Sequence, residues 1–452
     1  MKIIIAGDGK VGSTVARQLA HEGYDLTLID INPKVLGNSV ERFDIMTVQG
    51  NCASMGVLIE AGIKEASLLI AVTSYDEVNL LACMTAKGIN NKIHTIARIR
   101  NPEYTNQIYD MKDLFGLSLA VNPEKHAAVE MDRLLKVPGF LKRETFAKGR
   151  VEIVELRVDK NSKLCNKPLA DIYGIVKSNI LVCAVSRSGE SYIPDGKFIL
   201  KEDDRIFVTA TTQNLSTLLN NLDIVTHKVK NVMICGGGRL AYYLAVRLLK
   251  SGVSVVIIES DAKRCEELAE ILPDAVIING DASEEHLLES EGIENCDAVV
   301  TLTGLDELNI IISIYSKSRG IPHVITKFGH FTNNNILNTI DIGSTISPSE
   351  LCCNNILRYV RALHNKTGAA ISVHSIADGH AEASEFRADE KTLNCGVPLK
   401  DIKLKPNILI ACITHGSEPE IPNGNSLFQV GDTVLVVTNS DRVIYQLNDI
   451  FE

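Results

Sequence analysis

The chain lacks several features that would point to particular classes of protein. It has no tryptophan, its 11 cysteines include no C-x-x-C pair, and no apolar run approaches the roughly 20 residues that cross a bilayer. A basic excess is also missing, because 46 Lys and Arg stand against 56 Asp and Glu, a net charge of −10. This balance argues against a nucleic-acid binder, which needs a basic face. We expect a cytoplasmic protein with reduced, buried thiols and no structural zinc.

Only one polar cluster contains the residue types of a metal site. It comprises His374, Asp378, His380 and Glu382. Because the spacings of dedicated zinc sites are missing, we interpret this cluster as a polar turn between strands and expect no resident metal ion.

What the sequence does contain is an internal repeat. The segment Gly7–Gly12, with the sequence GDGKVG, recurs 229 residues later as Gly236–Ala241, with the sequence GGGRLA. The pattern T-x-x-D-E-x-N occurs at Thr73–Asn79 and again at Thr303–Asn309. Further matches continue downstream in the same register. An internal repeat of this length predicts a duplicated architecture.

Each copy divides into a larger α/β part and a smaller β-rich part. In the first copy the short apolar runs Lys2–Ala6, Asp25–Ile29 and Leu68–Val72 alternate with helical patterns, which predicts a parallel sheet covered by helices. The segments Val151–Thr209 and Ala370–Val437 instead carry short strands broken by Asp-Gly and Asn-Gly turns. The predicted fold class is α/β, with two Rossmann-like doubly wound domains, each followed by a small α+β domain.

The repeat also suggests where the domains begin and end. We expect larger domains at 1–136 and 229–363, and smaller domains at 145–225 and 368–452. Two amphipathic helices, Pro123–Leu135 and Pro348–Leu363, lie between the parts of each copy and begin with a proline that suits a first helical turn. They are candidates for crossovers or subunit contacts.

The glycines of the first repeat have the spacing of a dinucleotide-binding turn. Gly7 permits the tight turn after an apolar strand, Gly9 lets a pyrophosphate approach the backbone, and Gly12 lets helix and strand pack closely. Phosphates would rest on free amides at the helix N-terminus. Asp30, at the end of the next strand, can accept hydrogen bonds from ribose hydroxyls and would repel a 2′-phosphate. This favours NAD or an adenine nucleotide over NADP.

The second copy has the looser form G-x-G-x-x-A, with Glu259 in the position of Asp30. Two interpretations stay open for it. The second crevice is either a working nucleotide site or a domain retained for packing and symmetry.

Other polar residues belong at the edge where strands of a doubly wound sheet diverge. Thr73 and Ser74 could meet ribose or phosphate, and Arg98 could reach a phosphate with two hydrogen bonds or be a solvated surface residue. Asp76 is either an N-cap or a ligand contact, and Asn79 either a local polar contact or a ligand contact.

The size and motifs of the small modules help to distinguish an enzyme from a nucleotide sensor. A dehydrogenase needs a substrate domain that places an acid or base beside the nicotinamide, whereas only some eighty residues follow each larger part. They contain no G-x-S-x-G, H-E-x-x-H or P-loop motif. We therefore expect nucleotide binding without turnover, and keep an NAD-dependent oxidoreductase as the alternative.

Together with the segment Ile96–Tyr104, these motifs give the chain a resemblance to a known family. Over essentially its full length it resembles the TrkA family, the peripheral NAD-binding subunits of Trk-type potassium uptake systems, which carry tandem RCK-N and RCK-C domains. The resemblance implies a cytoplasmic subunit that docks on the inner face of the membrane under a potassium-translocating subunit of the Trk or Ktr type. It also implies a homo-oligomeric ring, with four chains expected, and a response to NAD(H) and to ATP or ADP.

The resemblance also implies nucleotide contacts, residue by residue. In the first copy these are Gly7, Asp8, Gly9, Lys10, Val11, Asp30, Thr73, Ser74 and Arg98, to which we add Gly12 and Asn51. In the second copy they are Gly236, Gly237, Gly238, Arg239, Leu240 and Glu259. The second copy departs from the pattern where Lys327 replaces Arg98 and Phe328–Thr332 replaces the segment that follows. We expect a weakened phosphate site there.

Two further alternatives remain besides an oxidoreductase: a regulator of another cation transporter and a purely structural scaffold. If the chain is a regulatory subunit of a potassium uptake system, our hypothesis is that nucleotides shift an equilibrium between ring shapes. The helices that begin at Pro123 and Pro348 would pass this change to neighbouring modules.

Overall fold

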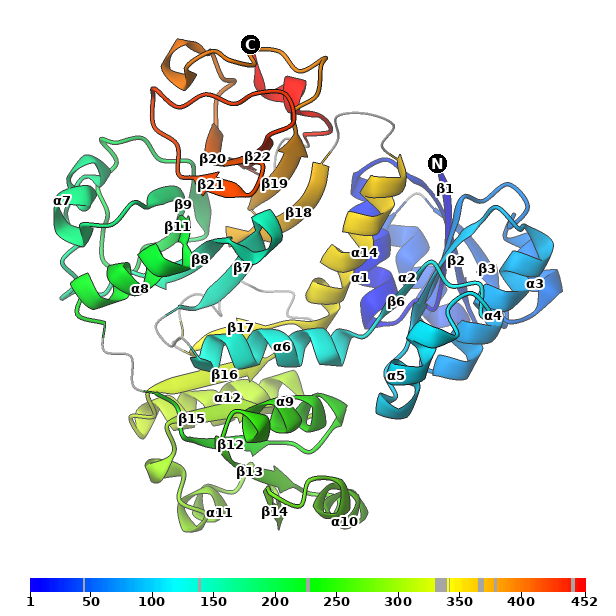
Figure 1. Ribbon diagram of the computed structural model, residues 1–452. Coiled ribbons are helices and arrows are strands. Elements are labelled where there is room, and N and C mark those ends of the chain that lie inside the picture. Colours follow the sequence, from blue (N-terminus) through cyan, green and yellow to red (C-terminus); the bar gives the residue numbers. More distant parts are fainter. Residues whose placement is uncertain are drawn as a thin grey trace.

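A computed structural model describes residues 1–43, 45–136, 140–224, 228–329, 340, 342–364, 370–377, 380–439 and 444–452. These residues form two six-stranded parallel sheets and two five-stranded antiparallel sheets (Figure 1). Each parallel sheet precedes an antiparallel one along the chain. The predicted fold class and the internal duplication are therefore confirmed.

The first large sheet has the doubly wound strand order. Its strands are β3-β2-β1-β4-β5-β6, formed by Met46–Gln49, Asp25–Asp30, Lys2–Ala6, Leu68–Ala71, His94–Arg98 and Leu119–Val121. The connecting helices are α1 (Lys10–His21), α2 (Pro33–Arg42), α3 (Met55–Glu60), α4 (Asp76–Ile89) and α5 (Pro102–Asp110). Because the strand order reverses between β1 and β4, a crevice opens at their carboxyl ends. The glycine turn lies at that point.

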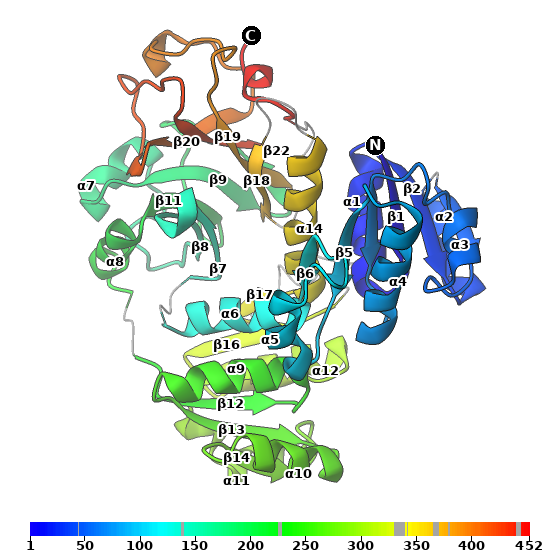
Figure 2. The same cartoon turned by 45° about the vertical axis from the view of Figure 1, so that its right-hand side comes forward.

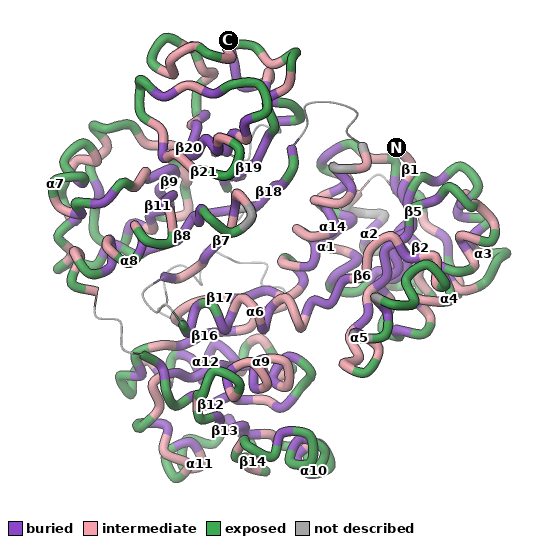
Figure 3. Tube along the Cα trace, in the orientation of Figure 1, coloured by how far each residue is buried: buried purple, intermediate pink, exposed green. Residues whose placement is uncertain are grey.

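The second large sheet repeats this order. Its strands are β14-β13-β12-β15-β16-β17, formed by Val276–Asn279, Ser254–Glu259, Asn231–Cys235, Ala298–Thr301, His323–Lys327 and Ser344–Ile346. Its helices include α9 (Arg239–Lys250), α10 (Ala262–Ile271), α11 (Glu285–Ser290) and α12 (Asp306–Ser318). The central strands of both sheets are buried and apolar, as expected where helices cover both faces (Figure 3).

Two long helices are exchanged between the copies. Helix α6 (Pro123–Lys136) follows the first large sheet but packs on α9 of the second, where its buried Met131 and Leu135 join the core of that sheet. Helix α14 (Pro348–His364) follows the second large sheet but packs on α1 of the first, through Ile356 and Val360. Figures 1 and 2 show both helices between the large sheets and the small ones. The prediction of crossover helices is thus confirmed, and the crossover runs between the two copies.

An ion pair with a buried carboxylate fastens each exchanged helix. Arg361 on α14 contacts Glu22 at the end of α1, with Nη2 to Oε1 at 2.5 Å, and both side chains are less than a tenth exposed. The same guanidinium lies 3.5 Å from Glu382 of the second small sheet. On α6 the carboxylate of Asp132 accepts from Arg247 of α9 at 2.7 Å. Charged groups this deeply buried hold their positions only when paired.

The small domains are β-rich and pack on each other. The first has the strand order β10-β9-β11-β8-β7, formed by Glu190–Tyr192, Leu181–Arg187, Arg205–Thr211, Val151–Arg157 and Lys142–Phe146, with helices α7 (Ile172–Val176) and α8 (Thr212–Asn221). The second has the order β18-β19-β22-β20-β21, formed by Ala370–Ile376, Ala381–Arg387, Thr433–Asn439, Ile408–His415 and Glu418–Glu420. Their facing sides share one apolar core, which includes Phe207 and Leu435. The edge strand β7 begins ahead of the sequence-predicted start at Val151.

The polar cluster considered as a metal site is dispersed. His374 turns to the first small domain, where its Nδ1 lies 2.6 Å from Glu144 Oε2, while Glu382 faces Arg361. Asp378 lies outside the described residues. Within the described part of the chain no group of three His, Cys, Asp or Glu side chains is placed to hold a metal ion. Nor does any described helix combine the length and apolar character needed to span a membrane.

One histidine of the second small domain lies between two carboxylates. His415 Nδ1 lies 2.7 Å from Asp432, and its Nε2 lies 3.2 Å from Glu420. Burial opposes the charge on the ring, but these hydrogen bonds outweigh it and raise the pKa of His415. The matching position of the first copy carries Arg187, which holds Asp204 with two hydrogen bonds.

We therefore expect the second small domain to lose stability as the pH rises. A raised folded pKa means that the stabilisation is complete below the unfolded pKa of about 6.5 and disappears as the pH passes through the folded pKa. The variant His415→Arg, which copies the first domain, should not show this loss. Thermal unfolding of both proteins between about pH 6 and pH 9 would check it, and identical pH profiles would contradict the assignment.

Candidate nucleotide crevice

The three glycines of the first glycine turn differ in what a side chain would meet at each position. Gly7 has φ of +97°, and a Cβ there would lie 2.8 Å from the backbone nitrogen of Thr73, so only glycine fits. A Cβ on Gly12 would lie 1.8 Å from the carbonyl oxygen of Gly7. A Cβ on Gly9, in contrast, would meet no atom within 4 Å. The space beside Gly9 is therefore open, and the protein itself does not require glycine there.

Within the described residues, the first backbone amides of α1, those of Lys10, Val11 and Gly12, make no hydrogen bond. Gly9 is the N-cap and provides no side-chain cap, and the first turn contains no acidic residue. Unpaired amides at the positive end of a helix dipole form an anion site. Asp30 lies beside it, with one carboxylate oxygen accepting from the amide of Asp8 and the other from the amide of Asn32, both at 2.8 Å. Asp30 thus fixes the turn as well as facing the crevice.

The side chain of Asp8 points away from the crevice. It is 3% exposed, and its Oδ2 accepts a 2.6 Å hydrogen bond from the hydroxyl of Ser39. Burial is the main reason why the pKa of Asp8 is raised, with the nearby Asp30 adding to it. The Asp8 side chain is therefore held by Ser39, and the nucleotide contact implied for Asp8 remains a prediction.

The Thr73 edge is held by Asn79. The amide and the hydroxyl of Thr73 both donate to Asn79 Oδ1, at 2.8 and 2.7 Å, and Asn79 Nδ2 donates to the carbonyl of Arg98 at 2.9 Å. The interpretation of Asn79 as a local polar contact is therefore confirmed. The Thr73 hydroxyl donates its one hydrogen within the protein, so it could meet ribose only as an acceptor.

Asp76 has a role that neither sequence interpretation contained. The N-cap of α4 is Tyr75, and Asp76 Oδ2 accepts from the backbone amides of Arg100 and Asn101 at 2.8 and 2.7 Å. Asp76 therefore clamps the segment that follows β5 against the start of α4.

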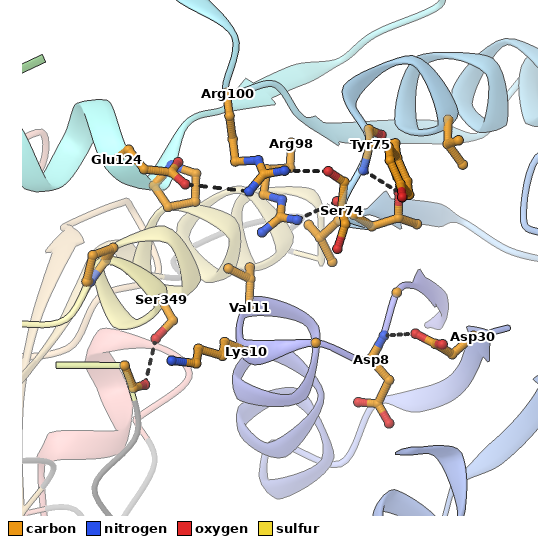
Figure 4. A pocket seen from close by; sticks show the side chains of 18 of the residues that line it. Asp8, Lys10, Val11, Asp30, Ser74, Tyr75, Arg98, Arg100, Glu124 and Ser349 are labelled. Atoms are coloured by element: carbon orange, nitrogen blue, oxygen red, sulfur yellow. Dashed lines mark hydrogen bonds and ion pairs between the residues drawn. The ribbon is translucent and has the colours of Figure 1, made fainter. Parts of the chain in front are cut away.

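Two arginines at the end of β5 lie over the start of α1 (Figure 4). Arg98 donates to the carbonyl of Thr73, and Arg100 donates to the carbonyl of Ser74. Burial lowers the pKa of Arg98, and the charge of Arg100 lowers it further. Within the described residues, Nε of each arginine is buried without a hydrogen-bond partner. The interpretation of Arg98 as a solvated surface residue is wrong, because the side chain lies in the wall of the crevice.

A cavity of about 860 Å³ runs from the first glycine turn to the second copy. Of the expected contacts it is lined by Gly7, Asp8, Gly9, Lys10, Val11, Asp30, Asn51, Thr73, Ser74, Arg98, Gly238, Arg239 and Leu240. Gly12, Gly236, Gly237 and Glu259 do not line it. The helix starts that follow both glycine turns thus open on one space, whereas of Asp30 and Glu259 only Asp30 lines it.

The second copy repeats the local geometry, with a lysine in place of one arginine. Glu259 accepts from the amide of Gly237 at 2.6 Å, as Asp30 does from Asp8, and Asn309 holds Thr303 as Asn79 holds Thr73. Lys327 takes the place of Arg98 and donates to the Thr303 carbonyl at 2.6 Å. Burial lowers the pKa of Lys327. Residues 330–332, part of the segment expected to weaken this site, lie outside the described residues.

Sequence reasoning missed several residues of the cavity wall. They are Ile31, Asn32, Val35, Cys52, Tyr75, Arg100, Glu124, Ser349 and others at the junction of the copies. Arg100 lies 3.8 Å from Glu124 at the start of α6, and Ser349 begins α14. Arg100 could have been found, since it lies two residues beyond Arg98 on the same segment. No local pattern indicates that the start of α14 approaches Lys10.

Comparison with known proteins agrees with this architecture. The family model of the TrkA-N domain matches residues 3–123 and 232–348, and that of the TrkA-C domain matches 153–223 and 384–451. The Trk system potassium uptake protein TrkA homolog of Archaeoglobus fulgidus is 31% identical over 451 residues and covers 100% of both chains. The TrkA protein of Halomonas elongata is 32% identical and covers 100% of this chain and 99% of its own.

Solved structures share the fold at lower identity. The crystal structure of the GsuK RCK domain superposes with a TM-score of 0.63 at 17% identity, covering 97% of this chain and 92% of that chain. A GsuK channel bound to NAD gives a TM-score of 0.62 at 17% identity, covering 97% and 77%. From the matched domains and the full-length relatives, the chain belongs to the TrkA family of potassium uptake proteins, with tandem TrkA-N and TrkA-C domains.

Proposed function

We propose that this chain is the regulatory subunit of a Trk-type potassium uptake system and that it binds NAD(H), and ATP or ADP, in the first crevice. The observation that carries the proposal is the cavity, which joins a free helix N-terminus and an acidic ribose position to basic groups of both copies. Its basic lining residues are Lys10, Arg98, Arg100, Arg239 and Lys327. A bound nucleotide would touch both copies at once, so it can favour one arrangement of the copies over another.

The lining supports an adenine nucleotide in a defined orientation. The end near Asp30 is walled by Ile31, Val35 and Cys52 and suits an adenosine, and the other end collects the basic side chains and suits phosphates. The GsuK structures, which share the fold, include one bound to NAD and one bound to ADP. We propose that the nucleotide is bound without being consumed, so steady turnover of NADH by this chain would contradict the proposal.

We expect NADH to bind about 10- to 100-fold more tightly than NADPH, because the Asp30 carboxylate accepts ribose hydroxyls and repels a 2′-phosphate. In Asp30→Asn this preference should shrink, since the charge is removed while the size of the side chain is kept. The matched control is Glu259→Gln, which changes the ribose position outside the cavity and should leave the preference intact. Calorimetric titration of the three full-length proteins measures it. Equal affinities for NADH and NADPH in the unchanged protein would refute the assigned ribose site.

We further propose that the chain assembles into a homo-oligomeric ring under a potassium-translocating subunit of the Trk or Ktr type, on the cytoplasmic side of the membrane. The duplicated helices α4 and α12 support assembly, because each exposes large apolar side chains at matching positions. These are Leu81 and Met84 in the first copy, and Ile311 and Ile314 in the second, all at least 40% exposed. Apolar groups repeated on both copies suit contacts between copies of one chain. The ranges 1–136, 145–225, 229–363 and 368–452 remain our proposed domains, with α6 and α14 each packed on the opposite copy.

A further inference from the structure

One side chain of the second copy makes its hydrogen bonds in the first. Tyr243 lies on α9, and its hydroxyl donates to the carbonyl of Arg100 at 2.9 Å. The same oxygen accepts from Asn122 Nδ2 at 3.1 Å and lies 3.3 Å from Thr105 Oγ1. Tyr243 does not line the cavity. A half-buried phenol with three polar neighbours is held in one place, because each neighbour fixes a different direction.

One partner of Tyr243, Arg100, lines the cavity, and another, Asn122, directly precedes the lining residues Pro123 and Glu124. The backbone of Arg100 is held on one side by Asp76, which accepts from its amide, and on the other by Tyr243, which donates to its carbonyl. Asn122 caps α6, because its Oδ1 accepts from the amide of Lys125 at 2.8 Å. The hydroxyl of Tyr243 therefore joins three elements: the arginine segment after β5, the start of α6, and the second copy's α9.

Among the described residues, the first copy does not return this contact. Position 14 of α1 corresponds to position 243 of α9 in the repeat, and it carries Thr14, whose hydroxyl donates to the carbonyl of Lys10 in its own helix at 2.7 Å. A threonine is too short to reach across, and its hydroxyl is already used. The hydrogen-bonded link through this position runs from the first crevice to the second copy.

We infer that Tyr243 is a positioning residue that transmits occupancy of the first crevice to α9 and α6. The inference rests on the proposed function, because it requires a nucleotide that draws on Arg98 and Arg100. Each guanidinium also has a buried Nε without a hydrogen-bond partner within the described residues, so a phosphate that binds it pulls on a side chain already bonded to the carbonyl of Thr73 or Ser74. The carbonyl of Arg100 then shifts, and Tyr243 carries the shift to the second copy.

The test compares Tyr243→Phe with Tyr242→Phe in the full-length protein. Both changes remove only a hydroxyl, the two rings are neighbours with centroids 5.5 Å apart, and the Tyr242 hydroxyl has no hydrogen bond within the described residues. For each protein, NADH affinity is measured by calorimetry, and amide hydrogen exchange is followed with and without saturating NADH. The informative segments are Gly7–Val11 at the glycine turn, α6, and the last turn of α9 at Arg247–Lys250.

We expect NADH to slow exchange at the glycine turn in all three proteins. In the unchanged protein and in Tyr242→Phe it should also slow exchange in α6 and at the end of α9 by about fivefold or more. In Tyr243→Phe this distant effect should fall below about twofold, while NADH affinity stays within about threefold of the original.

Each other outcome overturns a different statement. If NADH slowed exchange in α6 and at the end of α9 as much in Tyr243→Phe as in the unchanged protein, the role of Tyr243 would be refuted. The same conclusion would follow if NADH protected the glycine turn of the unchanged protein but not these two segments. In both cases the proposed function would stand. A loss of NADH affinity of about tenfold or more in Tyr243→Phe would make it a binding residue instead. Absence of protection at the glycine turn in the unchanged protein, with no heat of binding, would refute the proposed function and the inference with it.

Discussion

Gly9→Ala is expected to abolish most nucleotide binding while leaving the chain folded. The backbone of Gly9 is extended, with φ of −79° and ψ of −168°, a conformation that alanine adopts freely. The added methyl meets no protein atom within 4 Å, and it enters the space where phosphates would approach the start of α1. Overlap with a bound group costs about 1–3 kcal/mol, so NADH affinity should fall about 10- to 100-fold.

Gly7→Ala is the contrasting change at the same turn. Here φ is +97° and the methyl would lie 2.8 Å from the backbone of Thr73, so the protein itself is disturbed. Such strain costs about 1–3 kcal/mol, and thermal unfolding of the first large domain should shift to lower temperature. Gly9→Ala should show no such shift.

Three measurements distinguish a loss of nucleotide binding from a loss of stability in these variants. They are the unfolding temperature, NADH affinity, and nucleotide-dependent potassium flux with the membrane partner present. Gly238→Ala serves as the matched control in the second copy, since a Cβ there also meets no atom within 4 Å. If Gly9→Ala binds NADH like the unchanged protein, the glycines serve only the turn and the proposed site is wrong. If Gly238→Ala weakens NADH binding as much as Gly9→Ala, phosphates rest against both turns.

Removing the guanidinium of Arg361 is expected to destabilise the chain strongly. In Arg361→Ala the carboxylate of Glu22, of which 1% is exposed, would stay buried without its partner. Leaving one charge of a buried pair uncompensated typically costs about 3–5 kcal/mol. Glu382, 3.5 Å from the same guanidinium, would lose part of its compensation as well. Because α14 covers α1, the first large domain should unfold earlier than in the unchanged protein.

Urea unfolding of full-length Arg361→Ala measures this effect. The control is Arg157→Ala, whose partner Asp203 is 68% exposed, because exposed pairs contribute about 1 kcal/mol or less. The chain has several domains, so the midpoint of the first transition is compared rather than a single free energy. A midpoint for Arg361→Ala within the range of Arg157→Ala would show that the helix exchange does not depend on this ion pair.

The sequence indicated the features that depend on local chemistry. The glycine spacing predicted the turn at Gly7, and the alternation of apolar runs predicted both doubly wound sheets, because period and turn residues are written within a few neighbouring positions. The same logic placed Asp30 beside the turn, where the structure has it.

Contacts between residues far apart in the sequence could not be predicted from local patterns. An amphipathic helix shows that it has a partner without showing which surface that is, so the exchange of α6 and α14 is not visible in their sequences. The role of Asp76 depends on two backbone amides of the segment after β5, and the inward turn of Asp8 depends on Ser39. Both contacts join residues more than twenty positions apart and carry no local signature.

The exchange of the two long helices has a consequence for how the chain holds together. Two separate single-copy proteins with these surfaces would have to meet by diffusion, and their contact would weaken on dilution. Here the polypeptide tethers the partners, so each meets the other at an effective concentration set by the connection, of the order of millimolar for short flexible linkers. The pairing of the two halves is then independent of how much protein the cell makes, and only contacts between whole chains remain subject to mass action.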